Sequence, residues 1–330
     1  MSAALDLGTS RLRSLRHEND RLLARGCRSE YLVMEELPAV RRVLDLAKVA
    51  YARCEGAVML LGDCAGEYAS IFGVPCHPVF PQGRIPRNDP PARQALAAMI
   101  EGLLPDPSEP GEICCMTISG IAANDEGTPR QKRREFLSQV VALRGYVPVV
   151  VNASTALVLA ESGDESFSGM GFDFGAGSCS ASLVHRGEEV AHVSVPAAGD
   201  WIHLELARRA WEFCWDRARN RHLPPRQAAI WKESVAESLV EPSGEREKFL
   251  SELVRELIAH VIRSAGAEFA KRVGGAEALR PLPVVIGGGT SRLPGFQAIF
   301  KQIWSESQFP LKAAVIRPGS ESEYAVARGC

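Results

Sequence analysis

The sequence Leu5-Asp-Leu-Gly-Thr-Ser10 near the N-terminus has a counterpart in Gly171-Phe-Asp-Phe-Gly-Ala-Gly-Ser178, and a third glycine-rich string, Val284-Val-Ile-Gly-Gly-Gly-Thr-Ser-Arg-Leu-Pro-Gly295, follows later. In the first two strings an apolar run ends in Asp-x-Gly, which predicts a strand followed by a tight hairpin turn. Because glycine has no Cβ and tolerates positive φ, such turns let backbone N–H groups approach phosphate oxygens closely. The three strings together predict two phosphate-holding hairpins and a loop around one nucleotide.

The aspartates of the first two strings are candidate partners of a metal ion. Mg²⁺ keeps several of its waters in proteins and takes few carboxylates, so we expect Asp6 and Asp173 to reach it through water. In the third string, a buried strand over Leu282–Ile286 runs into a glycine turn and a helix from about Gly295. This loop would offer N–H donors and the flat guanidinium of Arg292 to a nucleoside. Each string alone also fits an ordinary hairpin or loop, and it is their joint order that favours a nucleotide site.

That order resembles the phosphate 1, phosphate 2 and adenosine motifs of the superfamily of actin, sugar kinases and heat-shock chaperones. Two further segments are similar to its connecting helices: Val149–Ala160, where a strand ends at a polar residue, and Glu323–Cys330, whose small residues permit close helix crossing. The resemblance covers most of the chain and is least clear between Arg11 and Pro110. It implies an α/β, two-domain actin-like fold, a duplicated ribonuclease H-like unit with a nucleotide cleft between the halves. The implied domains are residues 1–156 plus 313–330, and residues 157–312.

Within the superfamily, the bacterial actins of the MreB kind look closest. The chain length, the run Ala197-Ala-Gly-Asp200 before a helix and the ending Tyr324-Ala-Val-Ala-Arg-Gly329 carry this resemblance. The segment Ile113-Cys-Cys-Met-Thr-Ile-Ser-Gly120 also matches a strand and loop of that family, whereas Ser291-Arg-Leu-Pro-Gly295 looks more like the chaperone version. The resemblance implies ATP and Mg²⁺ as ligands and self-association into head-to-tail filaments.

The strings and the resemblance together indicate a set of nucleotide-binding residues. Lys232 and Glu233 are similar to the pair that reaches the purine in actins, although a Lys-Glu couple on a helix also fits an ordinary solvated face. The complete set is Gly8, Thr9, Ser10, Gly175, Gly177, Ser178, Gly199, Lys232, Glu233, Gly287, Gly288, Gly289, Thr290 and Arg292.

Asn152 stands where MreB-like and chaperone relatives have a glutamate, and eukaryotic actin a glutamine, that polarises the attacking water. An amide can orient water by hydrogen bonding but cannot take its proton, so we expect slow hydrolysis. Asn is also a favoured N-cap, and the same residue fits a cap for the helix that begins at Ala153. The candidate catalytic residues are therefore Asn152, Asp6 and Asp173.

The composition is that of an ordinary globular protein. The chain has 330 residues, of which 46% are hydrophobic and 24% charged, and its formal net charge of −2 predicts no bulk attraction to nucleic acid or anionic lipid. Nine cysteines form no Cys-x-x-Cys pair, and a reducing cytoplasm is the simplest setting. No signal peptide and no bilayer-spanning apolar run is evident. A membrane-touching loop at Leu103 and Leu104, as in MreB proteins, is less favoured than a place for both leucines in the core.

Hydrophobic periodicity predicts the elements between the strings. Leu37–Cys54 reads as a helix, and the stretch after Gly8 is basic and has no clear pattern. The other predicted helices are 92–104, 131–143, 201–217, 225–239 and 245–273, and the predicted strands are 3–7, 57–62, 113–118, 147–151, 171–174, 180–185 and 189–195.

Two functions of such a fold compete. The first is a slow ATPase that assembles into nucleotide-dependent cytoskeletal filaments. The second is a non-polymerising, chaperone-like or scaffold nucleotide switch. A small-molecule kinase is less favoured, because no aspartate is placed as a base for a substrate hydroxyl. The preference for ATP or GTP is open.

Overall fold

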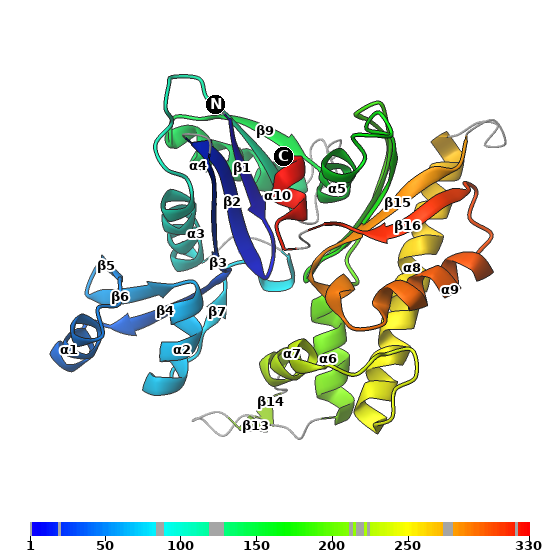
Figure 1. The fold of residues 1–330 in the computed structure, drawn as a ribbon. Coiled ribbons are helices and arrows are strands. Elements are labelled where there is room, and N and C mark those ends of the chain that lie inside the picture. Colours follow the sequence, from blue (N-terminus) through cyan, green and yellow to red (C-terminus); the bar gives the residue numbers. More distant parts are fainter. Residues whose placement is uncertain are drawn as a thin grey trace. The chain divides into compact units, whose positions relative to one another are not determined.

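The computed structural model describes residues 2–18, 21–83, 89–118, 129–210, 214–215, 221–222, 225–272, 280–320 and 323–330. These form two compact units. The first holds the described residues up to Ile118 and those from 129 to Val150, and the second holds the described residues from Val151 to Cys330 (Figure 1).

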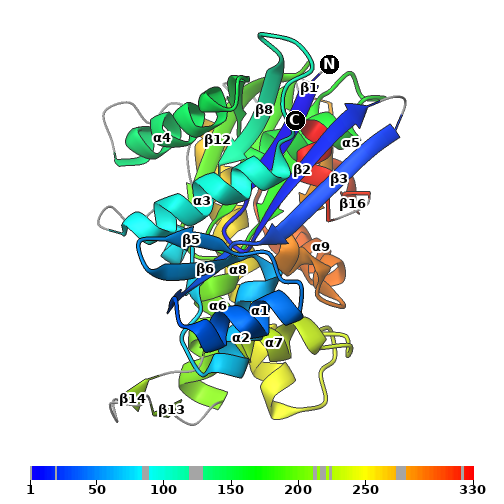
Figure 2. The same cartoon turned by 90° about the vertical axis from the view of Figure 1, so that its left-hand side faces the viewer.

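The first unit is built on a five-stranded sheet in the order β3-β2-β1-β8-β9. Its central strand β1 pairs antiparallel with β2 and parallel with β8, and helix α3 packs against α4 and β2 (Figure 2). The strands predicted at 113–118 and 147–151 are confirmed. The bounds are β1 Ser2–Leu7, β2 Arg11–Glu18, β3 Arg21–Arg28, β8 Ile113–Ile118, β9 Val147–Val151, α3 Pro90–Leu103 and α4 Pro129–Leu143.

A smaller sheet, in the order β5-β6-β4-β7, lies in the same unit and has its own apolar core around Leu32, Leu44 and Leu60. The predicted helix over Leu37–Cys54 is wrong beyond Leu46. Lys48 takes a positive φ of 54° after the helix, and the chain then returns as a hairpin. The bounds are β4 Glu30–Glu35, α1 Pro38–Leu46, β5 Ala52–Cys54, β6 Ala57–Leu61, α2 Asp63–Phe72, β7 His77–Pro78 and a short 3-10 helix, η1, Pro81–Gly83.

The second unit is built on a five-stranded sheet in the order β12-β11-β10-β15-β16. Of the predicted helix over 201–217, the part up to Ala210 is helical and Cys214 and Trp215 form a short strand, while the other positions lie outside the described residues. The predicted helix over 225–239 ends at Ser234. The bounds are α5 Ala153–Glu161, β10 Gly169–Phe174, β11 Cys179–His185, β12 Glu188–Val195, α6 Gly199–Ala210, β13 Cys214–Trp215, β14 Arg221–His222, α7 Pro225–Ser234, α8 Glu245–Arg272, β15 Leu282–Gly287, η3 Gly289–Arg292, α9 Phe296–Glu306, β16 Ala313–Pro318 and α10 Ala325–Gly329.

Aromatic side chains fill one face of the second sheet. Phe172 and Phe174 of β10 make edge-on contacts with Phe300 and Phe296 of α9, with ring centroids 5.4 and 4.9 Å apart. Edge-to-face packing adds to the free energy gained by burying rings of this size. This face also holds α8, whose buried side chains belong to the same core.

Small residues let α5 approach the sheet and α10 closely, as the sequence predicts for the connecting helices. A Cβ on Gly171 would lie 2.0 Å from the backbone oxygen of Ser154, and one on Gly329 would lie 1.8 Å from that of Ala156. Neither glycine can be replaced without moving a helix. Helices α5 and α10 lie side by side in both views (Figures 1 and 2).

The two five-stranded sheets have the same order of strands: third-second-first-fourth-fifth, when the strands of each sheet are numbered along the chain. In both, a hairpin joins the first two strands and the first strand pairs in parallel with the fourth. This confirms the duplicated α/β architecture. The compact units are divided at Val150, and they group β16 and α10 with the second sheet, whereas the domains predicted from the sequence join residues 313–330 to the first.

Two observations concern membranes. No helix among the described residues is both long and apolar enough to cross a bilayer. Leu103 and Leu104 are 5% and 0% exposed, so they are core residues and present no side chain to a lipid surface.

Candidate functional site

The first predicted hairpin joins β1 and β2, with Asp6 opposite Arg13 in the antiparallel register. A Cβ on Gly8 would lie 2.6 Å from the backbone oxygen of Arg11, so only glycine fits this turn. Thr9 is buried and Ser10 is exposed. The turn therefore has the tight geometry expected of a phosphate-holding hairpin.

Asp6 is held by two side chains that the sequence analysis did not identify. Thr117 Oγ1, from the parallel neighbour β8, donates to Asp6 Oδ1 at 2.8 Å, and Arg13 Nη1 lies 3.5 Å from Oδ2. Burial raises the pKa of Asp6, while Arg13 and Thr117 act in the opposite direction. Thr117 and Asp6 are 111 positions apart, and only the sheet register brings them together.

The second hairpin repeats this geometry in the second unit. A Cβ on Gly175 would lie 2.8 Å from the backbone oxygen of Ser178, just as Gly8 faces that of Arg11. Asp173 occupies the place of Asp6, and it pairs with Ser180 across the hairpin and with Gly287 of β15. Each glycine thus follows its aspartate by two positions and faces a carbonyl three positions later.

Three predicted segments of the second unit meet at the backbone oxygen of Gly175. The N–H of Gly199, at the start of α6, donates to it at 3.1 Å, and Thr290 Oγ1 donates at 3.3 Å. The N–H of Asp200 donates to the oxygen of Ala176 at 2.8 Å. The hairpin, the start of α6 and the glycine loop are therefore one connected structure.

The glycine loop after β15 packs directly on the second hairpin. Gly288 has φ 89°, and a Cβ there would lie 2.4 Å from the carbonyl carbon of Phe174. A Cβ on Gly287 would meet the side chain of Leu157, whereas one on Gly289 would meet no atom within 4 Å. The loop then forms η3, in which Arg292 is exposed to solvent.

Lys232 and Glu233 of α7 differ in their environments. Glu233 is exposed, but Lys232 is only 6% exposed. Burial lowers the pKa of Lys232 to about 8, opposed by the carboxylates of Asp200 and Glu233 and by Cys179. The interactions with Asp200 and Cys179 put the ammonium group next to the second hairpin, so Lys232 is not part of a solvated couple.

Asn152 stands at the N-cap of α5, and its backbone oxygen accepts from the N–H of Ala156. Its side chain makes no capping hydrogen bond. Instead, Nδ2 donates to the carboxylate of Glu189 at 3.0 and 2.8 Å. The sequence analysis did not identify Glu189, which lies 37 positions away on β12.

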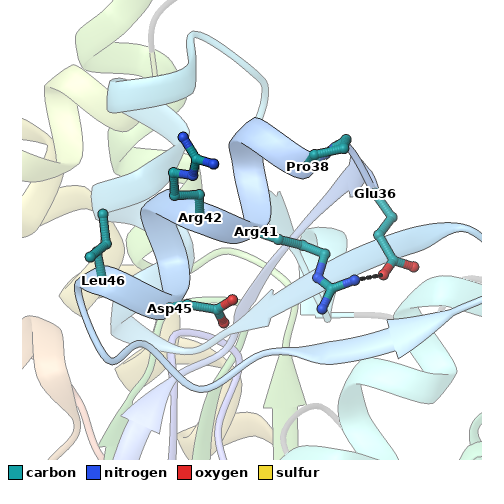
Figure 3. Close-up of a pocket in the computed structure, with 6 residues that line it drawn as sticks. All are labelled: Glu36, Pro38, Arg41, Arg42, Asp45 and Leu46. Atoms are coloured by element: carbon teal, nitrogen blue, oxygen red, sulfur yellow. Dashed lines mark ion pairs between the residues drawn. The ribbon is translucent and has the colours of Figure 1, made fainter.

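A hollow of about 510 Å³ on the first unit lies away from these residues. It is formed by α1 and by Glu36, two residues before the helix, with Arg41 turned toward Glu36 in an ion pair of 3.5 Å (Figure 3). Its lining is Glu36, Pro38, Arg41, Arg42, Asp45 and Leu46, and none of these is a predicted site residue.

Comparison with known families identifies the chain. The volactin family model matches residues 1–330. The chain belongs to the volactin family. Among curated protein sequences, none matches it.

Solved structures of actin-like proteins are similar to the chain over nearly its full length. The MamK double helical filament matches with 16% identity and a TM-score of 0.67, covering 99% of this chain and 96% of that one. MreB5 of Spiroplasma citri bound to AMPPNP matches with 14% identity and a TM-score of 0.66, covering 99% and 93%. The ADP-bound form of MreB5 gives 13% identity, a TM-score of 0.65 and coverage of 99% and 94%. These matches confirm the predicted actin-like fold.

Proposed function

We propose that the chain binds ATP or GTP together with Mg²⁺, and that its two glycine hairpins are phosphate-binding turns. The observation that carries the proposal is the repeated turn, in which Gly8 and Gly175 each face a backbone carbonyl at a distance that excludes a side chain. Backbone N–H groups in such turns are suited to phosphate oxygens. MreB5, which is similar in fold, has been crystallised with AMPPNP and with ADP.

Asp6 and Asp173 fit a hydrated Mg²⁺ ion. Each carboxylate lies next to the space that a side chain on the hairpin glycine would fill, with Oδ2 3.9 Å from the Cβ position of Gly8 and 3.6 Å from that of Gly175. In the part of the chain that the structure describes, no group of three His, Cys, Asp or Glu side chains could ligate a metal directly. A hydrated ion does not require one.

The remaining predicted residues suit the sugar and base of the nucleotide. Lys232 supplies a buried cation beside the second hairpin, and Arg292 supplies an exposed guanidinium beside the glycine loop. Gly199 and Thr290 fix the hairpin through Gly175.

A binding experiment tests this assignment. We expect Asp6→Asn and Asp173→Asn each to weaken Mg²⁺-dependent binding of AMPPNP by about tenfold, because a neutral amide supports the ion's waters less well than a carboxylate. Asp164→Asn, at an exposed turn, is the control. Calorimetry that finds unchanged affinity in both hairpin variants, with Mg²⁺ present, contradicts the site.

We propose further that the protein is a slow ATPase, which assembles head to tail into filaments in the cytoplasm. A heterologous contact that does not close propagates without limit. MamK, similar in fold, forms a double helical filament. The cysteine side chains that the structure describes are free thiols, which suits a reducing compartment.

Sedimentation across a concentration series, with ATP and with ADP, tests the assembly. A critical concentration that is lower with ATP is the expected result. The alternative is a chaperone-like switch, which is favoured by the resemblance of Ser291–Gly295 to the chaperone motif. A monomer at every concentration and salt would exclude filaments and favour the switch.

A further inference from the structure

The side chain of Asn152 is oriented by a carboxylate from another element. Its Nδ2 lies 3.0 Å from Oε1 and 2.8 Å from Oε2 of Glu189. Because an ionised carboxylate only accepts hydrogen bonds, the NH₂ end of the amide has to face it. The amide oxygen Oδ1 therefore points the other way, away from the carboxylate of Glu189.

Glu189 is itself fixed by hydroxyl groups. Thr155 Oγ1, in the first turn of α5, donates to Glu189 Oε2, and Ser182 Oγ of β11 lies 3.2 Å from the same atom. Ser182 also contacts Ser154 at 2.7 Å, and Ser154 accepts from Ser180 at 3.1 Å. The carboxylate is thus anchored in a network of hydroxyls that joins the first turn of α5 to β11 and reaches the start of β11 beside the second hairpin.

The direction in which the amide points matters for water. An attacking water must keep a lone pair free for phosphorus, so a protein group that orients it should accept one of its hydrogens. Asn152 Oδ1 can do this, whereas a turned amide would present NH₂, a donor that engages the lone pair instead.

We infer that Glu189 is a positioning residue, which holds the NH₂ end of Asn152 and so presents Oδ1 to the water that attacks the nucleotide. This inference rests on the proposed nucleotide hydrolysis. It also gives a reason for the amide at this position: a glutamate or aspartate there would meet the carboxylate of Glu189 at hydrogen-bond distance, and two like charges so close cannot both stay ionised.

An exchange of the two functional groups tests the inference. Glu189→Gln replaces a charge-assisted hydrogen bond with a neutral one, so we expect kcat to fall about tenfold with KM unchanged. Asn152→Asp places two carboxylates together, and we expect both kcat and Tm to fall. In the double variant the amide at position 189 can donate to the carboxylate at position 152, so Tm should recover. Its kcat should exceed that of either single variant, because the water now meets a carboxylate.

The controls separate this inference from the proposed function. Glu188→Gln changes an exposed carboxylate on the same strand and should leave kcat, KM and Tm unaltered. AMPPNP affinity should stay the same in all four variants. The inference would be overturned if Glu189→Gln had the kcat and KM of the wild type. It would also be overturned if kcat fell in the variants only in proportion to their loss of Tm. If the wild-type protein binds nucleotide without hydrolysing it, the positioning role is excluded but the proposed binding survives; if it binds no nucleotide, both fail.

Discussion

Lys232→Met replaces a buried ammonium with an apolar side chain of similar size. Burial lowers the pKa of Lys232 from its ordinary value of 10.5 to about 8, in spite of the carboxylates of Asp200 and Glu233. A tenfold change in an equilibrium is worth about 1.4 kcal/mol, so keeping this side chain charged in the folded state at pH 7 costs about 3 kcal/mol.

The sign of the pH dependence follows from the direction of the pKa change. The unfolded chain binds the proton of Lys232 more tightly than the folded chain does, so the cost is fully present below about pH 8 and falls as the pH rises toward 10.5. We expect Lys232→Met to raise the free energy of unfolding by about 3 kcal/mol at pH 7, and by about 1 kcal/mol less at pH 9.

Urea unfolding without nucleotide, at pH 7 and pH 9, measures both quantities. Lys248→Met, which changes an exposed lysine of α8, is the control and should alter neither. Equal stability of Lys232→Met and wild type, or the same gain at both pH values, would refute the reasoning. If Lys232 contributes to nucleotide binding, Lys232→Met should also bind AMPPNP more weakly than the wild type. Binding-site residues commonly lower the stability of the folded protein in this way.

Two further predictions concern the glycine loop and the hydrogen bond between Thr117 and Asp6. Gly288→Ala should lower the free energy of unfolding by at least about 2 kcal/mol in urea titrations, because its Cβ would overlap the backbone of Phe174 and its φ is positive; Gly289→Ala, with open space around it, should change stability by less than about 0.5 kcal/mol. Equal effects of the two would contradict the packing of this loop. Thr117→Val removes a hydrogen bond to Asp6 and should raise the pKa of that carboxyl further, so Mg²⁺-dependent nucleotide affinity should fall more at pH 5.5 than at pH 8 in fluorescence titrations. A loss that is the same at both pH values would exclude this role of Thr117.

The sequence alone determined the tight turns and the individual strands and helices next to them. The Asp-x-Gly turns, the buried strand before the glycine loop and the helix that starts after Gly295 depend on residues adjacent in the chain, and all are present. The strands at 113–118 and 147–151 have the predicted bounds, because each is a short apolar or β-branched run between turn signals. The basic stretch after Gly8 gave no pattern, yet it forms β2 and β3. The pairing of β2 with β1 and of β3 with β2 outweighs the weak local preference.

Partners of the candidate residues were decided only by the tertiary structure. Thr117 reaches Asp6 through the parallel register of two strands, and Glu189 reaches Asn152 from the far strand of a hairpin. Ser180 and Ser182 alternate along the sequence and could have indicated a polar face of β11, but not the carboxylate of Glu189, which Ser182 contacts. Burial of Lys232 likewise depends on what packs over α7. Such contacts arise from how sheets and helices stack, so residues tens of positions apart meet without leaving a local signal in the chain.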